Sequence, residues 1–453
     1  MDKAVTRVLR ALLGDELIAI YGDFDADGIT ATVLLAEGIS EMGGRVVSYI
    51  PHRVDEGHGL NNVALKNLKE QGVSLVVTVD CGITGVSEVE EGQKLGLDII
   101  ITDHHVPLTH IPQAVAAIDP KCPGSTYPFY ELAGVGVAFK LLQALFSATN
   151  RYGGWEKFLD LVAMGTVVDM VPLLGENRHL VKCGIEGLNK SQRPGVRELV
   201  LCSGLQMGKI DSESISYILG PRLNASGRMD HAVISYELLT TSSPEQAREL
   251  AALLETRNVE RQRLTAEVLA RARGKLVPEA AEKLLLLVGG DDYPPGVAGV
   301  VAGRLADEFY RPVIVLNLDG DTVRGSARSI PEFDIVTALT ECEDLLTRFG
   351  GHSPAAGFRT PRANLEQLNQ RLLDIAEREL ADVDLRPTLT IDALIPLSAL
   401  GWETYKVISK LEPFGQANQA PVFLSQKVKV VDSRTVGGTG KHLKLKLRDG
   451  QVV

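Results

Sequence analysis

Three carboxylates lie within five residues near the start of the chain, at Asp23, Asp25 and Asp27. Carboxylates this close repel one another unless a cation neutralises them, and such oxygen ligands suit a hard divalent metal ion. An apolar, β-branched run at 17–21 comes directly before them. The sequence therefore predicts a metal site immediately after a short strand.

Three other interpretations of this motif stay open at this point. The spacing matches the first half of a calcium-binding EF-hand loop, although a strand precedes it and Leu34 stands where such a loop carries a bidentate glutamate. Residues 25–28 also resemble the nucleophile motif of haloacid-dehalogenase-like phosphatases. The third interpretation is a solvated acidic turn without a function.

Three further polar groups follow segments that are expected to be buried. Asp80 comes directly after one apolar strand, an Asp-His-His run at 103–105 comes directly after the next, and Asp169 ends an apolar run. Because the carboxyl ends of parallel strands meet along one edge of a sheet, these groups are expected to converge with the first motif. Carboxylates with one or two imidazoles suit Mn²⁺, with Mg²⁺ next, and the lack of cysteine pairs argues against a structural zinc site.

The residues from 17 to 118 alternate short β-branched runs with amphipathic stretches. This alternation predicts βα units, and therefore a mostly parallel sheet covered by helices on both faces. The expected strands are 17–21, 45–50, 75–79, 98–102 and 114–118, and the expected helices are 29–41, 60–71 and 84–95. A helical stretch follows at about 133–197.

A long helix is expected further on. Residues 243–246 form a capping box with Pro244 at the first helical position, and no glycine or proline follows up to Arg273. The result is about 30 residues of helix, or about 45 Å. A helix so rich in polar residues is best explained as a strut between two domains.

The chain after this helix has two patterns. Strands at 283–288, 313–317 and 322–329 with helices at 297–309, 335–349 and 365–379 predict a second, smaller α/β domain. From Leu385 the pattern is of strands, at 388–391, 422–431 and 442–448. The last of these alternates leucine with basic residues next to a turn at 437–440, so the hairpin has an apolar and a basic face, as a small β-barrel that contacts phosphates requires. The chain stops where another strand begins, so the barrel is expected to be incomplete.

Composition limits the class of protein. The chain has 453 residues, of which 45 % are hydrophobic and 23 % charged, which fits about three globular domains. It has no apolar stretch long enough for a bilayer, no signal-peptide pattern and an odd number of cysteines, so a soluble cytoplasmic protein is expected. The net charge of −11 argues against coating nucleic acid by bulk electrostatics, but residues 427–453 carry seven Lys and Arg against two Asp.

In their order along the chain, the polar clusters resemble the four motifs of the DHH phosphoesterase superfamily, at 23–28, Asp80, 103–105 and Asp169. Three downstream segments are similar to the RecJ exonuclease family within it, at 220–229, 324–328 and 350–357. The resemblance implies an α/β fold with a parallel-sheet DHH catalytic domain, a long connecting helix, a smaller α/β DHH-associated substrate domain and a partial OB-type β-barrel that binds single strands. The implied domains span 1–240, 241–274, 275–384 and 385–453.

The resemblance also implies roles for individual residues. The implied ligands of two Mn²⁺ ions, for which Mg²⁺ can substitute, are Asp23, Asp25, Asp27, Asp80, His104 and Asp169, with Asp80 as the bridge. The implied catalytic residues around the scissile phosphate are His105, Asn224, Arg228 and His352. The implied pocket for a 5′-terminal phosphate consists of Arg53, His58, Ser326 and Arg328. Single-strand contacts on the barrel are implied for Lys444 and Lys446.

The reaction that the resemblance implies is metal-dependent 5′ to 3′ hydrolysis of single-stranded DNA to 5′ mononucleotides, in DNA repair and recombination. It further implies 5′-phosphorylated single strands as substrate, a single-strand-binding protein and a helicase as partners, and no membrane. The alternatives are a DHH phosphodiesterase on short oligoribonucleotides or cyclic dinucleotides, an inorganic pyrophosphatase, and a scaffold without activity. The long helix and basic hairpin argue against the first two, and the complete set of carboxylates and histidines argues against the third.

Overall fold

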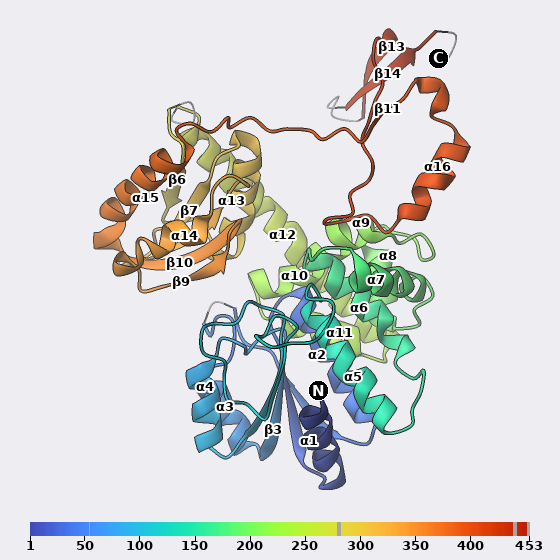
Figure 1. The fold of residues 1–453 in the computed structure, drawn as a ribbon, viewed down its shortest axis with the longest axis vertical. Coiled ribbons are helices and arrows are strands. Elements are labelled where there is room, and N and C mark those ends of the chain that lie inside the picture. Colours follow the sequence, from blue (N-terminus) through green and yellow to red (C-terminus); the bar gives the residue numbers. More distant parts are fainter. Residues whose placement is uncertain (54, 279–281, 438–441, 451–453) are drawn as a thin grey trace.

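The computed structural model describes residues 1–53, 55–278, 282–437 and 442–450. Its N-terminal unit is built on a five-stranded sheet in the order β2-β1-β3-β4-β5, with all neighbouring strands parallel (Figure 1). The strands are β1 (Leu17–Tyr21), β2 (Arg45–Tyr49), β3 (Val73–Val79), β4 (Asp98–Thr102) and β5 (Ala116–Ile118). The prediction of a parallel sheet is confirmed.

Helices cover both faces of this sheet. They are α1 (Asp2–Leu13), α2 (Ala26–Glu41), α3 (Asn62–Glu70), α4 (Val86–Lys94) and α5 (Gly134–Ala148). Alternate residues of β1 enter two different cores: Ile18 and Ile20 pack with α1, α2 and α5, whereas Ala19 and Tyr21 pack with α3 and α4 (Figure 1). Because both faces of the sheet are buried, its central strands are apolar throughout.

A second group of helices extends this unit beyond the sheet. It comprises α6 (Leu159–Val168), α7 (Gly175–Leu188), α8 (Pro194–Cys202), α9 (Ser212–Ser214), α10 (Gly220–Met229) and α11 (Val233–Thr240), with a π-helical turn at Ile215–Leu219. The predicted helical stretch is thus confirmed and divides into α5 to α8. Nearly every residue of α6 is buried, and the helix ends at Asp169.

The predicted long helix is α12 (Pro244–Leu276). Ser243 Oγ caps it by accepting a hydrogen bond from the Gln246 N–H (3.3 Å). The second bond of a capping box is not formed, because the Gln246 side chain accepts from Thr241 Oγ1 instead (2.6 Å). One stripe of the helix is buried along its length, so α12 packs on both units that it joins.

The second unit contains a five-stranded sheet in the order β6-β7-β8-β10-β9, in which β6 and β7 are parallel and the other pairs antiparallel. Its strands are β6 (Leu286–Gly290), β7 (Val313–Asn317), β8 (Thr322–Arg328), β9 (Arg348–His352) and β10 (Ala355–Pro361). Its helices are α13 (Pro295–Phe309), α14 (Ile335–Thr340) and α15 (Leu365–Leu380). The prediction of a smaller α/β domain is confirmed.

The prediction of one helix over 335–349 is wrong. Helix α14 ends at Thr340, and the chain returns as β9, which pairs with β10 over residues 348–359. Two glycines at 350 and 351 disfavour a helix, and Ser353 with Pro354 supplies the turn between the strands. The hairpin places His352 at the end of β9.

The C-terminal region contains two small sheets: β11 (Ala393–Leu394) pairs with β12 (Phe423–Leu424), and β13 (Lys429–Val436) pairs with β14 (His442–Arg448). The helix α16 (Trp402–Ile408) lies between β11 and β12 in sequence, with short 3₁₀ turns at Leu397–Ala399 and Ser409–Leu411. The other 3₁₀ turns lie earlier in the chain, at Glu156–Phe158, Glu343–Leu345 and Arg362–Asn364. The strand predicted at 388–391 is wrong, because pairing starts only at Ala393. The strand predicted at 422–431 divides into β12 and β13, and the turn at 437–440 lies mostly outside the described residues.

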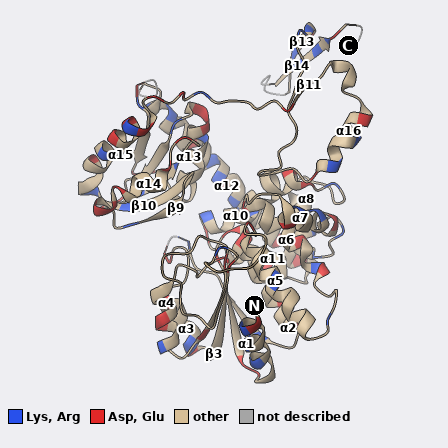
Figure 2. Ribbon diagram, viewed as in Figure 1, with Lys and Arg blue, Asp and Glu red and all other residues tan. Residues whose placement is uncertain are grey.

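The β13–β14 hairpin has the predicted two faces. On β14, Lys444 and Lys446 alternate with Leu443 and Leu445. The two leucine side chains are 63 % and 43 % exposed, respectively. Lys and Arg lie on both strands of the hairpin (Figure 2). Its apolar face is thus not covered by the part of the chain that the structure describes. Among those residues, no helix has the length and apolar composition needed to cross a membrane.

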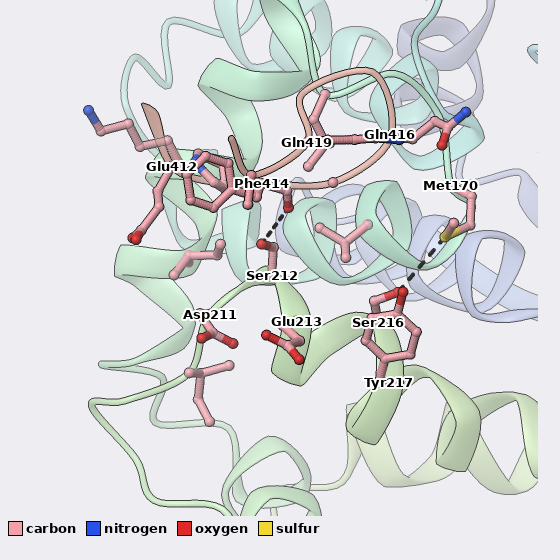
Figure 3. Close-up of a pocket in the computed structure, with 18 of the residues that line it drawn as sticks. Met170, Asp211, Ser212, Glu213, Ser216, Tyr217, Glu412, Phe414, Gln416 and Gln419 are labelled. Carbon is pink, nitrogen blue, oxygen red and sulfur yellow. Dashed lines mark hydrogen bonds between the residues drawn. The ribbon is translucent and has the colours of Figure 1, made fainter. Parts of the chain in front are cut away.

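A loop of the C-terminal region docks on the N-terminal unit. Ser212 Oγ donates to the Phe414 carbonyl (2.6 Å), the Leu173 N–H donates to the Gln416 carbonyl (2.7 Å), and Arg178 Nη2 donates to the Leu411 carbonyl (2.8 Å). We call residues 411–416 the docking loop. It forms one wall of a pocket of about 740 Å³ whose opposite wall comes from α6, α7 and α9 (Figure 3).

Candidate metal centre

The first group of carboxylates lies where β1 ends and α2 begins. Asp25 caps α2, and its Oδ1 accepts hydrogen bonds from the backbone N–H groups of Asp27 (3.0 Å) and Gly28 (3.1 Å). Asp23, Asp25 and Asp80 each place a carboxylate oxygen within 4.8 Å of the others. The predicted convergence of strands β1 and β3 at this edge of the sheet is observed.

Asp80 ends β3 in a left-handed backbone conformation, with a φ of 59°. Its carboxylate lies against the first residue of α5, Gly134, where a Cβ atom would stand 2.5 Å from Asp80 Oδ1. The Gly134 N–H also donates to Asp27 Oδ2 (2.7 Å), and the Val135 N–H donates to Asp27 Oδ1 (2.9 Å). Sequence reasoning did not identify Gly134, whose lack of a side chain makes room for the carboxylate.

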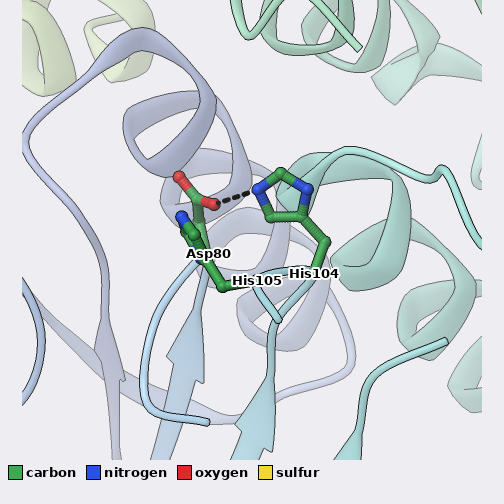
Figure 4. A group of neighbouring side chains, drawn as sticks. All are labelled: Asp80, His104 and His105. Carbon is green, nitrogen blue, oxygen red and sulfur yellow. Dashed lines mark ion pairs between the residues drawn. The ribbon is translucent and has the colours of Figure 1, made fainter. Parts of the chain in front are cut away.

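Asp27, His104 and Asp169 form a second group with ligand atoms within 4.8 Å of one another. His104 Nε2 lies 3.1 Å from Asp80 Oδ1 (Figure 4). The same nitrogen lies 3.7 Å from Asp169 Oδ2. Asp80 therefore contacts both groups, through the carboxylates after β1 on one side and through His104 on the other. Its position is the one that a ligand bridging two ions would occupy.

Several of the atoms that could ligate a metal in these groups are buried and have no hydrogen-bond partner among the described residues. They are Asp23 Oδ1, Asp80 Oδ1, Asp169 Oδ2 and both ring nitrogens of His104. Buried polar atoms in proteins are otherwise almost always paired. A set of carboxylate oxygens with one imidazole fits Mn²⁺ or Mg²⁺, and the two groups fit two such ions.

The electrostatics of the site agree with this fit. Burial raises the pKa of Asp80 well above its usual range, and the negative charges of Asp27 and Asp25 raise it further. Burial and the charge of Asp25 also raise the pKa of Asp27 to about 7. Burial, together with His105, lowers the pKa of His104 to about 3, so its imidazole is neutral and has a free lone pair. Bound cations would lower these raised pKa values and allow the carboxylates to be ionised at the same time.

Asp103 orients the second histidine of the motif. It accepts hydrogen bonds from His105 Nδ1 (2.7 Å) and from the Ile83 N–H (2.9 Å). Burial alone raises the pKa of Asp103, but the hydrogen bond and charge of His105 outweigh it and lower the pKa to about 2. The His105 ring stacks on His352 of the second unit, with centroids 6.1 Å apart. The predicted pair His105 and His352 is therefore brought together, and Asp103 is a supporting residue that sequence reasoning assigned no role.

Two predicted phosphate-binding residues follow β2 and lie beside the first group. His58 Nδ1 is 3.1 Å from Asp23 Oδ2, and the charge of Asp23 raises the pKa of His58 to about 9. The Arg53 guanidinium lies over the Phe24 ring, 4.8 Å from its centroid. This loop thus adds two cationic groups to an otherwise acidic edge.

Helix α10 supplies two more of the predicted residues. Asn224 Oδ1 accepts a hydrogen bond from the Ala26 N–H (2.7 Å), so it supports the first turn of α2. Arg228 Nη1 donates to the Gly296 carbonyl at the start of α13 (3.3 Å). Arg228 therefore lies at the boundary between the two units.

Ser326 and Arg328 lie two residues apart on β8, so their side chains share one face of the strand. Burial, with the like charge of Arg53, lowers the pKa of Arg328, and burial, with Arg53 and other arginines, lowers that of Arg228 to about 9. These three guanidinium groups are thus neighbours across the boundary, and none forms an ion pair within the described ranges. Lys444 and Lys446 are not part of this cluster, because their hairpin lies far from the sheet edge (Figure 1).

Asp119 follows β5 at the same edge of the sheet and was also missed. Burial raises its pKa to about 7, and its Oδ1 accepts from the Lys121 N–H (2.7 Å). Its position after the fifth predicted strand was the available signal, since acidic residues also follow β1, β3 and β4 at that edge.

Comparison with known proteins agrees with this arrangement. Family models match the DHH family N-terminal domain at residues 17–166, the DHHA1 domain at 280–381 and the RecJ OB domain at 391–453. The chain is 39 % identical to the single-stranded-DNA-specific exonuclease RecJ of Bacillus subtilis over 99 % of its own length and 57 % of that protein's. It is 34 % identical to RecJ of Dickeya dadantii, over 98 % of its own length and 80 % of the relative's.

A solved structure extends the likeness to the fold. RecJ of Thermus thermophilus in complex with Mn²⁺ superposes with a TM-score of 0.84 at 30 % identity, covering 98 % of this chain and 64 % of that one. The same protein was solved with Mg²⁺. The chain thus spans little more than half the length of the Bacillus relative but most of the Dickeya one. With identity above 30 % across four fifths of a relative, the chain belongs to the RecJ family.

Proposed function

We propose that the chain is a metal-dependent exonuclease that hydrolyses single-stranded DNA from its 5′ end to 5′ mononucleotides. The observation that carries the proposal is the pair of ligand groups linked by Asp80, which belongs to the first group and contacts His104 of the second. The relatives of the chain are named single-stranded-DNA-specific exonucleases. Family membership alone supports a single-strand-binding protein and a helicase as partners.

The proposed ligands of two Mn²⁺ ions, with Mg²⁺ as substitute, are the six residues of the two groups: Asp23, Asp25, Asp27, Asp80, His104 and Asp169. When bound, two such ions activate water and stabilise charge on a phosphodiester. The chain's own residues hold this site from three sides. Asp25 is fixed by the start of α2, Asp27 by the start of α5, and Asp80 by its place at the end of β3.

Other side chains would act on the phosphate itself. His105, held by Asp103, and His352 present two stacked imidazoles beside the ligand groups, and Arg228 adds a guanidinium. Hydrogen bonds from such groups stabilise negative charge that develops on a phosphate in the transition state. Asn224 is the fourth proposed catalytic residue. Its side chain supports the site by accepting a hydrogen bond at the start of α2.

The polarity of the enzyme is proposed to come from the cluster of Arg53, His58, Ser326 and Arg328. Substitution of glutamine for Arg328 is expected to lower kcat/KM on 5′-phosphorylated DNA by about tenfold to 100-fold, because a charge-assisted hydrogen bond contributes about 1.5 to 3 kcal/mol. On 5′-hydroxyl DNA, which never makes the contact, kcat/KM should barely change. Equal losses on both substrates would show that Arg328 acts on the scissile phosphate or on the fold. The control is Arg362→Gln, which should change neither value: Arg362 is exposed and directly follows β10, at the opposite end of the β8–β10 pairing from Arg328.

The β13–β14 hairpin is proposed to bind the single-stranded DNA at a distance from the metal centre. Replacing Lys444 and Lys446 together with alanine should weaken binding of long single strands and lower the log–log salt slope by about 0.7 for each lost phosphate contact. Turnover of a very short oligonucleotide should stay unchanged, because the hairpin lies far from the metal centre. The control is Lys66→Ala on α3, which removes an exposed lysine from the N-terminal unit. A salt slope equal to that of the wild type would remove the hairpin from the path of the substrate.

One panel tests the function as a whole. The purified chain is incubated with Mn²⁺ and end-labelled single-stranded DNA, duplex DNA, a short RNA or a cyclic dinucleotide, and the products are separated by size. We expect mononucleotides from the 5′ end of single-stranded DNA only, and no product after removal of metal by a chelator. Cleavage restricted to short RNA or cyclic dinucleotide would replace the proposal with a small-substrate phosphodiesterase, and no cleavage at all would contradict it.

A further inference from the structure

The connecting helix α12 buries polar residues in the middle of its length. The buried stripe begins with Ala247, Ala251 and Leu254 and ends with Val268, Ala272 and Leu276. These two apolar parts enter the cores of the N-terminal and second units, respectively. Between them the same stripe carries Asn258, Arg261 and Thr265. The polar middle therefore lies where the helix passes from one unit to the other (Figure 1).

Two donors in this polar middle have no acceptor. Arg261 Nη2 donates to Asn258 Oδ1 (2.8 Å), but Arg261 Nε and Asn258 Nδ2 are buried and have no partner in the described ranges. The relative exposure of Arg261 is only 9 %. A buried guanidinium that is only partly hydrogen-bonded is unusual, because each unpaired donor has lost its water without a replacement.

The charged groups around Arg261 are also cationic. Burial, with the like charges of Arg304 and Arg222, lowers the pKa of Arg261, and Arg261 in turn contributes to the lowered pKa of Arg228. Arg222 is neutralised by Glu255, with 2.5 Å between Nε and Oε2. Arg228, Arg261 and Arg304 have no carboxylate partner in the part of the chain that the structure describes, although the surface of α12 is rich in paired acidic residues.

Helices α10, α12 and α13 pack on one another and carry Arg228, Arg261 and Arg304, respectively, and the charge of Arg261 acts on both of the other two. An anion that joins a cluster of like charges relieves their mutual repulsion, and a guanidinium fork matches a phosphate. Arg228 connects this cluster to the arginines near the metal centre, because it is a neighbour of Arg53 and Arg328 as well. The cluster therefore continues the cationic surface of the site along α12.

We propose that Arg261 and Arg304 form a second phosphate subsite next to Arg228, in addition to the positions for the scissile and the 5′-terminal phosphate. Its ligand is a phosphate ester, either of the strand being cleaved or of the mononucleotide that is released. The proposal rests on the proposed function, since that function supplies the phosphates. Arg261 is a binding residue here and makes no contact with the reacting atoms.

The test compares Arg261→Gln and Arg304→Gln with the wild type in the full chain. The matched control is Arg263→Gln, two residues further along α12, where Arg263 is 54 % exposed and paired with Glu260 and Glu267. On long 5′-phosphorylated single strands, each subsite variant should raise KM about tenfold with little change in kcat, and lower the log–log salt slope by about 0.7. On a 5′-phosphorylated dinucleotide, kcat/KM should stay at the wild-type value, and Arg263→Gln should match the wild type throughout.

Inhibition by a 5′ mononucleotide identifies the source of the phosphate. If the strand supplies it, the variants lose affinity for long DNA and keep the inhibition constant of the wild type. If the product supplies it, the inhibition constant rises about tenfold in both variants and the salt slope on long DNA is unchanged. Losses of equal size on the dinucleotide and on long DNA would overturn the subsite, as would wild-type behaviour of both variants in both assays.

Two features keep this test separate from the wider proposal. Arg304 is exposed, so Arg304→Gln stays informative even where Arg261→Gln lowers the melting temperature, and Arg261→Lys should restore part of the salt slope because it restores the charge. If the wild type itself does not cleave single-stranded DNA, the proposed function fails. If the wild type cleaves it and the variants do so equally well, only the subsite fails.

Discussion

Substitution of asparagine for Asp80 is expected to abolish hydrolysis of single-stranded DNA with either Mn²⁺ or Mg²⁺. Asp80 belongs to the first ligand group and lies 3.1 Å from His104 of the second, so a neutral amide weakens the hold on both ions at once. A catalytic metal ion contributes several kcal/mol to stabilisation of the transition state, so the expected loss of kcat/KM is on the order of 1,000-fold. Asparagine has the shape of aspartate and tolerates a left-handed backbone, so the fold should be kept.

The matched control for this variant is Asp15→Asn. Asp15 also has a left-handed backbone, with a φ of 50°, but its side chain is 77 % exposed and pairs only with Arg45. It should keep wild-type activity, and both variants should keep the wild-type circular dichroism spectrum. Titration calorimetry with Mn²⁺ should show weaker binding for Asp80→Asn alone. Retention of more than a few per cent of activity in Asp80→Asn would show that this carboxylate does not bridge the ions.

Substitution of alanine for Gly134 should cost about 100-fold in kcat/KM, although Gly134 contacts no substrate. Its added Cβ would stand 2.5 Å from Asp80 Oδ1 and 2.6 Å from Asp80 Cβ, so β3 or α5 has to shift. The Gly134 N–H also holds Asp27, so the same shift disturbs both ligand groups. A displacement of about 1 Å at a catalytic centre is enough for a loss of this size.

Gly136→Ala, two residues further along α5, is the control. The three atoms nearest to a Cβ at Gly136 belong to the Leu132 side chain, at 3.3 Å or more, and alanine favours a helix over glycine by up to about 1 kcal/mol. This variant should match the wild type in activity and equal or exceed it in melting temperature. Steady-state kinetics over a range of Mn²⁺ concentrations would distinguish the two glycines. Wild-type kinetics for Gly134→Ala would mean that the space beside Asp80 is not needed.

The parts of this site that could be predicted from sequence are those that local pattern determines. Uniformly apolar runs such as 17–21 indicate strands that are buried on both faces, and a polar residue after such a run is placed at the carboxyl edge of the sheet. That reasoning placed Asp80 and the 103–105 motif correctly. It also explains why Asp119 could have been found, since it follows the same kind of run.

The parts that could not be predicted depend on contacts between distant segments. Gly134 opens a helix like many other glycines, and its importance comes from the Asp80 carboxylate 54 residues earlier in the chain. The predicted helix over 335–349 ran into the first two residues of β9, because the pairing of β9 with β10 is a contact that the local pattern does not show. Arg261 looks like any arginine of a polar helix until the second unit packs beside it.

The docking loop determines how a pulling force would travel through the molecule. The C-terminal region is joined to the second unit by residues 381–392, a segment without helix or strand that reaches about 40 Å when fully extended. It is held to the N-terminal unit by hydrogen bonds to Leu173 and Arg178, and Leu173 lies four residues after Asp169. Tension on a strand held by the β13–β14 hairpin would therefore be borne by hydrogen bonds close to the metal centre.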